Sequence, residues 1–186
     1  MGCAAAEARL QSYLETSSPA WLISSGFAGA ARSHYRVGDL LLAENYSDND
    51  LLQKARHLLR RHNVHTARLF TAPAMIDEAA ARAEIWTRQQ AAAIDMETEA
   101  LARVCAHRQL RMLSLRVFSD TPRHPFPLPG HLLFDLERQQ TPTAKLFRHL
   151  LAHPAALPRL LRFSVQVGRA RRALSEALID LLTSDL

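Results

Sequence analysis

Short apolar runs alternate along this chain with longer segments whose apolar residues recur every three or four positions. The clearest run, residues 112–118 (MLSLRVF), is typical of a buried strand, and shorter runs lie at 40–43, 66–70 and 91–96. Strands separated by helices of about ten or more residues indicate βαβ units and a sheet covered on both faces. The pattern therefore predicts an α/β fold, a three-layer α/β/α sandwich with a mostly parallel or mixed central sheet.

Other segments complete this prediction. Residues 21–24 form one more apolar run, which leads into the sequence SSGFAG, and helices are expected over 4–14, 51–61, 77–89, 97–107, 143–151 and 155–182. A length of 186 residues suits a single domain that buries most of its apolar surface.

The domain divides into three parts by composition. Residues 1–120 carry the strands and the first helices, and residues 142–186 carry the C-terminal helices. Between them, residues 121–141 are predicted to form a loop or lid, because four of the nine prolines fall in the sequence TPRHPFPLPG.

Charge and cysteine content limit the function classes. Lysine plus arginine exceed aspartate plus glutamate by 23 − 18, a net charge of +5, and the arginines are scattered along helices, which favours a solvated surface over a nucleic-acid site. Cys3 and Cys105 are too few for a disulfide framework and suit a reducing cytoplasm. No basic and apolar leader and no run of about 18 apolar residues occurs, so neither a secretory signal nor a membrane span is predicted.

Ligands of parallel α/β sheets bind beyond the carboxyl ends of the strands, and three stretches are expected at such an edge. The first is residues 24–30, SSGFAGA, whose glycines allow the backbone to pass close to a ligand. The alternative is a plain turn after a strand, because short glycine patterns are weak motifs.

The second stretch is Asp95, Met96 and Glu97, where a small-residue strand runs into a helix. A carboxylate at a helix start is favoured by the dipole and can accept two hydrogen bonds from a vicinal diol, while a methionine can lie against a sugar or base. The alternative is that both carboxylates cap the helix and Met96 belongs to the core.

The third stretch is Ser119 and Asp120, which the strand at 112–118 delivers to the same edge. A carboxyl group shielded from water can hold a proton near neutrality and give it to a leaving group. The alternative is an aspartate that caps the turn into the proline-rich loop.

Together these stretches resemble the family of purine nucleoside and uridine phosphorylases and methylthioadenosine/S-adenosylhomocysteine nucleosidases, which share one fold. Residues 25–29 match the family's Ser-Gly-x-Ala-Gly loop, and 37–39 match its Val-Gly-Asp turn. Residues 95–97 match the Asp/Glu-Met-Glu signature, and 119–120 match the later Ser-Asp pair. The resemblance covers about residues 1–120, and the C-terminal helices look more like those of the hopanoid-associated phosphorylase branch.

The resemblance implies cleavage of the N-glycosidic bond of a purine nucleoside, deoxynucleoside or adenosyl compound. Glu97 would hold the ribose 2′ and 3′ hydroxyls, Met96 would pack under the sugar, and Asp120 would protonate or hydrogen-bond the departing purine. Further substrate contacts are expected from a set of neighbouring residues: Asp95, Ser119, Ser25, Gly26, Ala28 and Gly29. It also implies a homo-oligomer that needs no cofactor, with inorganic phosphate as a possible co-substrate.

The nucleophile is left open between water and phosphate. In the family, a strand and loop ahead of the position of Met1 supply a catalytic carboxylate or a phosphate loop, so the chain is expected to begin roughly forty residues into the fold, by ordinary element lengths. Either a longer protein is an active enzyme, or the short form is a degenerate paralogue that binds nucleosides or serves as a structural protein.

No metal site is predicted. Among nine histidines, only His149 and His153 have the i, i+4 spacing of a helix-borne ligand pair, and Pro154 directly after them favours a helix end instead.

Overall fold

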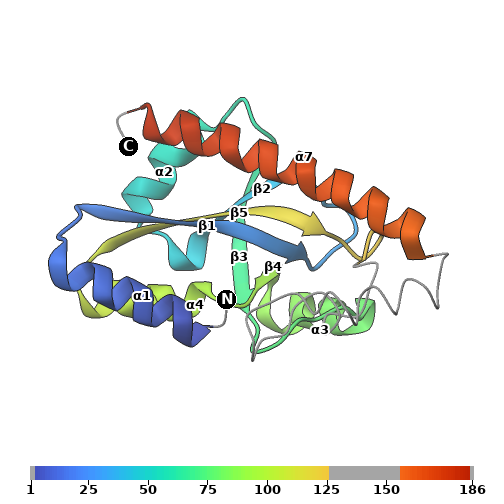
Figure 1. Cartoon of the computed structure of the whole chain (residues 1–186), viewed down its shortest axis with the longest axis horizontal. Coiled ribbons are helices and arrows are strands. Elements are labelled where there is room, and N and C mark those ends of the chain that lie inside the picture. Colours follow the sequence, from blue (N-terminus) through green and yellow to red (C-terminus); the bar gives the residue numbers. More distant parts are fainter. Residues whose placement is uncertain (1–2, 126–155, 185–186) are drawn as a thin grey trace.

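The computed structural model describes residues 3–125 and 156–184 (Figure 1). In chain order the elements are α1 (Cys3–Thr16), β1 (Trp21–Ala30), β2 (Leu40–Ala43), the short 3₁₀ helix η1 (Glu44–Tyr46), α2 (Asn49–Leu58), β3 (Val64–Thr71), α3 (Ala79–Gln89), β4 (Ala91–Asp95), α4 (Thr98–His107), β5 (Arg111–Asp120) and α7 (Ala156–Leu182). The predicted helix at 143–151, most of the proline-rich loop and the His149/His153 pair lie outside the described residues.

The sheet is mixed and closes on itself in the order β1-β4-β3-β2-β5. Three neighbouring pairs, β1–β5, β2–β3 and β3–β4, are parallel, whereas β1–β4 and β2–β5 are antiparallel. The predicted α/β fold with a mixed central sheet is therefore confirmed. Closure through β1 and β4 is an additional feature, which brings the ends of β4 and β5 to the same strand.

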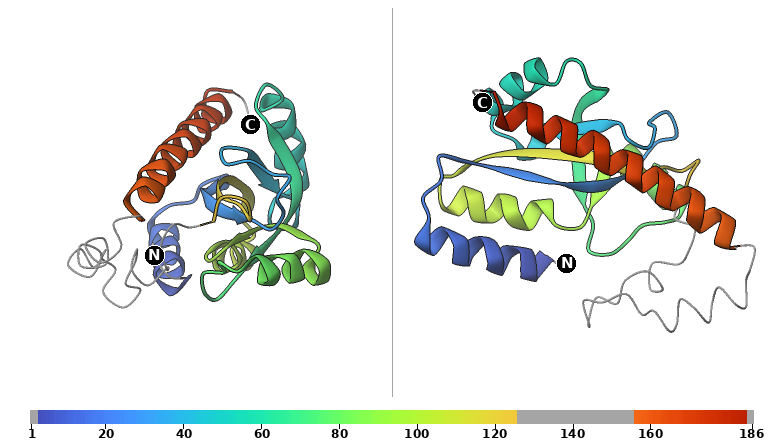
Figure 2. Two further views of the ribbon diagram at one scale, coloured as in Figure 1. Left: turned by 90° about the vertical axis from the view of Figure 1, so that its right-hand side faces the viewer. Right: turned by 45° about the horizontal axis from the view of Figure 1, so that its top comes forward.

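Helices cover the sheet on two sides. Figure 1 shows α7 and α2 on one side of the β1–β5 pair and α1, α3 and α4 on the other, and Figure 2 shows the same layers from two further directions. Leucines of β2, β5, α2 and α7 form the largest apolar cluster, among them Leu42, Leu115 and Leu174. On the opposite side, Leu10 of α1 packs with Val104 of α4 and Met112 of β5.

The prediction of a glycine loop at residues 24–30 is wrong, because these residues continue β1. β1 pairs with β5 from Trp21↔Arg111 to Gly29↔Asp120, so the long partner strand keeps the chain extended where its own residues favour a turn. Ala28 and Ala30 are buried in the closed sheet, since only small side chains fit there beside Phe118.

In the described part of the chain, no helix combines the length and the apolar character needed to cross a bilayer.

Candidate functional site

Strand β1 connects the ends of the two strands that carry the predicted acidic residues. Gly29 of β1 is paired with Asp120, the last residue of β5, and also with Ile94, next to the last residue of β4. Because β4 runs antiparallel to β1, the chain after Ile94 leads back toward Gly26. The sequence-predicted residues thus lie along one strand, with Asp120 beside Gly29 and the start of α4 toward the other end.

Asp120 is only 2% exposed and forms a buried ion pair with Arg82 of α3. The Ser119 hydroxyl donates to the second carboxylate oxygen of Asp120 at 2.7 Å. Arg82 is itself fixed, since its Nε donates to the Ile76 carbonyl at 2.9 Å and its Nη1 to the Ala30 carbonyl at 3.1 Å. Asp120 is therefore a held, ion-paired carboxylate and not the cap of the following turn.

Arg82 is a functional candidate that the sequence analysis missed. It lies three positions before buried Ile85, hence on the same face of α3, and both side chains are buried. The sequence does carry one signal for this: Arg82 falls on the apolar face of its helix. A charged side chain in that position is expected to have a buried partner of opposite charge.

A β-bulge shapes the end of β5. Ala28 pairs with Phe118 and Gly29 pairs with Asp120, so Ser119 is an extra residue without a partner position. Bulges re-aim the side chains beside them. Gly29 provides the room, because a Cβ atom there would lie 3.1 Å from Asp120 Oδ2 and 3.2 Å from Arg82 Nη1.

Asp95 lies in a second buried network. Its carboxylate accepts hydrogen bonds from the hydroxyls of Thr98 and Thr71, the latter at 2.9 Å, and from Arg116 Nε at 3.0 Å. Arg116 also donates to the Ser24 carbonyl and the Ser24 hydroxyl, both at 2.8 Å. These donors occupy both carboxylate oxygens, so Asp95 joins β1, β4, β5 and α4 from within. Its contact with a substrate stays a prediction.

Glu97 and Met96 are partly buried at the start of α4. Glu97 is the N-cap residue, but its side chain makes no capping hydrogen bond, and its N–H lies 3.4 Å from Asp95 Oδ1. The Cys3 thiol donates to the Met96 carbonyl, which places the first turn of α1 against this segment. Of the two carboxylates that were expected to cap the helix, Asp95 does so, because it accepts from N–H groups at the start of α4. The Glu97 carboxylate does not cap the helix.

The remaining predicted residues divide between the two faces of β1. Ser25 and Phe27 are exposed, and a Cβ atom added at Gly26 would meet no atom within 4 Å. Gly26 and Gly29 are three positions apart, so they face opposite sides of the strand and lie about 10 Å from one another. The structure thus groups Ser119, Asp120, Ala28 and Gly29, and leaves open space at Gly26.

A third carboxyl group, Asp77, lies near the Arg82–Asp120 pair and was not predicted. Among the described residues, its Oδ1 atom is buried without a hydrogen-bond partner. Burial raises the pKa of Asp77, the Asp120 charge adds to this rise, and Arg82 opposes it.

Within residues 3–125 and 156–184, no group of three histidine, cysteine, aspartate or glutamate side chains is arranged to hold a metal ion. A cleft of about 390 Å³ is present, but its lining includes none of the predicted site residues.

The family model for the phosphorylase superfamily matches residues 1–152. The chain belongs to this superfamily. Comparison with curated protein sequences gave no match.

Solved structures of the superfamily superpose on the chain. The 5′-methylthioadenosine/S-adenosylhomocysteine nucleosidase of Neisseria meningitidis, in complex with methylthio-immucillin-A, matches with a TM-score of 0.71 and 14% identity over 100% of this chain and 78% of that one. Native futalosine hydrolase of Helicobacter pylori matches with a TM-score of 0.70 and 12% identity over 98% and 76%. A mutant of the same futalosine hydrolase matches with a TM-score of 0.60 and 16% identity. That match covers 64% of this chain and 66% of the length of the relative. At these identities the likeness establishes the fold of the superfamily member.

Proposed function

We propose that this superfamily member cleaves the N-glycosidic bond of a purine nucleoside, deoxynucleoside or adenosyl compound, by phosphorolysis or hydrolysis. The observation that carries the proposal is the register of β1, which pairs Gly29 with both Asp120 and Ile94. Two acidic stretches separated in sequence are thereby aligned along one strand.

The roles proposed for the site residues are those that the family resemblance implies. They suit the chemistry of glycosidic cleavage, which develops positive charge on the sugar and negative charge on the base. Groups that act on both ends lower the barrier. Glu97 would bind the ribose hydroxyls and Met96 would lie under the ring. Asp120, held by Arg82 and Ser119, would contact the base at the other end of the strand.

Asp95 and Arg116 take positioning roles in this proposal. Their buried network fixes the end of β4 against β1 and β5, and the Asp95 carboxylate also faces the Glu97 N–H. Active-site groups supported by fully bonded neighbours keep the geometry that catalysis requires.

The nucleophile attacks the anomeric carbon as the carbon–nitrogen bond breaks, and the base leaves with a proton on nitrogen. Water yields the free sugar and phosphate yields the sugar 1-phosphate. The family resemblance supports both.

The test is base release measured by chromatography with adenosine, inosine and methylthioadenosine, each with and without phosphate. Free base from at least one substrate supports the proposal, and release only with phosphate assigns phosphorolysis. Ligand-induced thermal stabilisation without release would assign a nucleoside-binding protein instead. If the protein shows no base release and no thermal stabilisation with any of these compounds, a nucleoside site is rejected.

We infer further that the protein is a cytoplasmic homo-oligomer. Leu157, Leu161 and Val165 recur every four positions on α7 and are 48%, 60% and 56% exposed, an apolar stripe that a second copy could cover. Light scattering tests this, since a monomeric mass at micromolar concentration would contradict it.

A further inference from the structure

The cleft of about 390 Å³ is built from three segments distant in the sequence. Residues 33–37 of the β1–β2 connection form one wall, Arg123 and His124 of the turn after β5 form the second, and Gln166 and Arg169 of α7 form the third. Helix α7 lies alongside β5, so its middle part reaches the end of that strand (Figures 1 and 2).

Hydrogen bonds from backbone N–H groups hold two of these walls in place. In the first, the Gly38 N–H donates to the Phe118 carbonyl at 2.9 Å, and the Arg36 N–H donates to Asp39 Oδ2 at 2.9 Å. In the second, Thr121 and His124 exchange backbone hydrogen bonds at 3.1 and 2.9 Å. Tyr35 is 8% exposed, and its ring centroid lies 4.9 Å from that of Phe118, which anchors the first wall in the core.

More than half of the lining residues are basic. The lining includes three arginines and two histidines and no acidic residue: Arg36, Arg123, Arg169, His34 and His124. In the described ranges, none of the three guanidinium groups forms an ion pair. Asp39 is the acidic residue nearest to Arg36 in the sequence. Its carboxylate accepts hydrogen bonds from the Arg36 N–H and from the Asn63 side chain, and it lies 3.4 Å from His65 Nε2.

The pKa of His34, in the first wall, lies below its ordinary value mainly because of desolvation. The charges of Arg32 and His65 lower it further, whereas the charge of Asp39 raises it. A basic concavity without internal counter-charges attracts anions.

We propose that this cleft binds a small phosphate-bearing anion, at a site distinct from the strand-end site of Asp120 and Glu97. Arginine forks match the geometry of phosphate oxygens, and arginines from three separate segments line this cleft. The volume falls within the range of small-molecule sites and exceeds the need of a bare phosphate ion, so that a phosphate ester fits alongside Tyr35 and Val37. The proposal stands independently of glycosidic cleavage.

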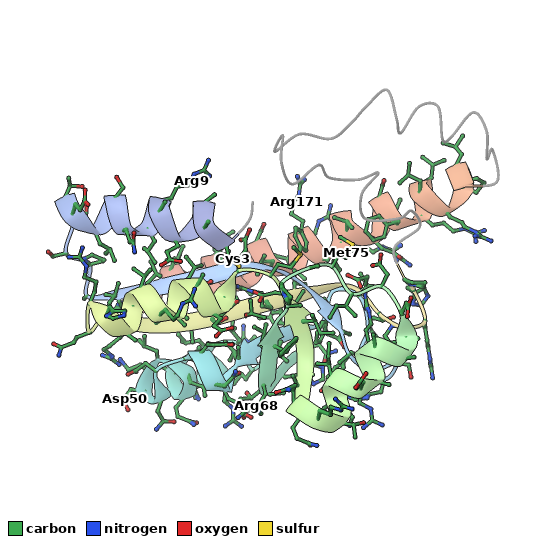
Figure 3. The ribbon with its side chains drawn as sticks, turned by 90° about the horizontal axis from the view of Figure 1, so that it is seen from below. Cys3, Arg9, Asp50, Arg68, Met75 and Arg171 are labelled. Carbon is green, nitrogen blue, oxygen red and sulfur yellow. The ribbon has the colours of Figure 1, made fainter. Side chains whose placement is uncertain are left out.

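The test is isothermal titration calorimetry of the full chain with inorganic phosphate and with ribose 5-phosphate, with ribose and with sodium chloride of equal ionic strength as controls. The variants are Arg123→Gln and Arg169→Gln. The matched control is Arg171→Gln, which removes the same charge from α7 but lies about 200° around the helix from Arg169. Figure 3 labels Arg171 where it projects from α7.

We expect saturable binding of at least one phosphate probe and no binding of ribose. Arg123→Gln and Arg169→Gln should each weaken it by about tenfold or more, the usual effect of losing a hydrogen bond to a charged group. Arg171→Gln should bind as the parent does. Tighter binding of ribose 5-phosphate than of inorganic phosphate would assign an ester site, and the reverse would assign the free ion.

Three results would overturn the proposal. One is the absence of saturable binding of either phosphate probe. Another is equal weakening by Arg171→Gln and Arg169→Gln, which would mean that only total charge matters. The third is unchanged binding in both Arg123→Gln and Arg169→Gln, which would place the phosphate outside the cleft.

Discussion

Arg82 and Asp120 form a buried ion pair that ties α3 to the end of β5, with side chains 3% and 2% exposed. Removing one partner of such a pair leaves an uncompensated charge in a dry environment, which is more costly than removing both. The pair is thus a sensitive point for stability as well as the support of the proposed base-contacting carboxylate.

Arg82→Met should lower the free energy of unfolding by about 3–5 kcal/mol because Asp120 loses its buried partner. Urea denaturation measures this. The control is Arg88→Met on the same helix, which breaks an exposed i, i+4 pair with Glu84 and should have little effect. Arg82→Met combined with Asp120→Asn should recover part of the loss. Equal stability of the Arg82 and Arg88 variants would contradict a structural role for the pair.

The two glycines of β1 offer a second test. Gly29→Ala places a Cβ atom 3.1 Å from Asp120 Oδ2, against groups that are tied by other hydrogen bonds, and should cost about 1–3 kcal/mol as overpacked sites do. Gly26→Ala meets open space and should be neutral or slightly stabilising, since it restricts the unfolded chain. Thermal or urea unfolding that ranks the two variants in the opposite order would show that the bulge does not constrain Asp120.

Thr98→Val tests the Asp95–Arg116 network. The Thr98 hydroxyl contacts both charged groups and is 0% exposed, so its removal should destabilise the protein by about 1–3 kcal/mol. Thr87→Val on α3 is the control, because that exposed hydroxyl bonds only to the Ala83 carbonyl of its own helix. We expect a small change for Thr87→Val, and a comparable loss in both variants would argue against a special contribution of the network.

Asp77 should make stability depend on pH in a defined direction. Because burial raises its pKa in the folded state above the ordinary value of 3.8, the folded protein binds the proton more tightly than the unfolded chain. The contribution of Asp77 to the free energy of unfolding therefore falls as pH rises from about 3.8 through the raised value. Asp77→Asn removes this effect.

The measurement is urea unfolding of the parent and Asp77→Asn from about pH 4 to about pH 8. The variant should gain stability relative to the parent as pH rises, and the two should converge toward acid. A constant difference across this range would contradict the buried environment of Asp77.

Much of the fold could be predicted because its signals are local. The runs at 40–43, 91–96 and 112–118 are strands nearly as predicted, and α1, α3, α4 and α7 follow the expected helical periodicity. The last part of β1 was mistaken for a loop because Gly26 and Gly29 weaken any local strand preference. Its conformation depends on pairing with β5, about ninety positions later by the register of Ser24 with Ser114.

The candidate site was predictable in outline and not in its contacts. The acidic residues at the ends of β4 and β5 follow from the pattern of strands and helices. That Arg82 pairs with Asp120, and that Arg116 fills the Asp95 carboxylate, depends on tertiary packing between elements far apart in the sequence. Similar carboxylates therefore have different surroundings, which spacing alone does not distinguish.

The most direct test of the central claim is base release by the parent, Asp120→Asn and Glu97→Gln in one assay, with Glu99→Gln as the control. Glu99 is an exposed carboxylate two positions after Glu97. We predict that Asp120→Asn lowers base release by about tenfold to a hundredfold, as for loss of a general acid or base, that Glu97→Gln also lowers it, and that Glu99→Gln does not. Unchanged release in both Asp120→Asn and Glu97→Gln would contradict a nucleoside bound along β1.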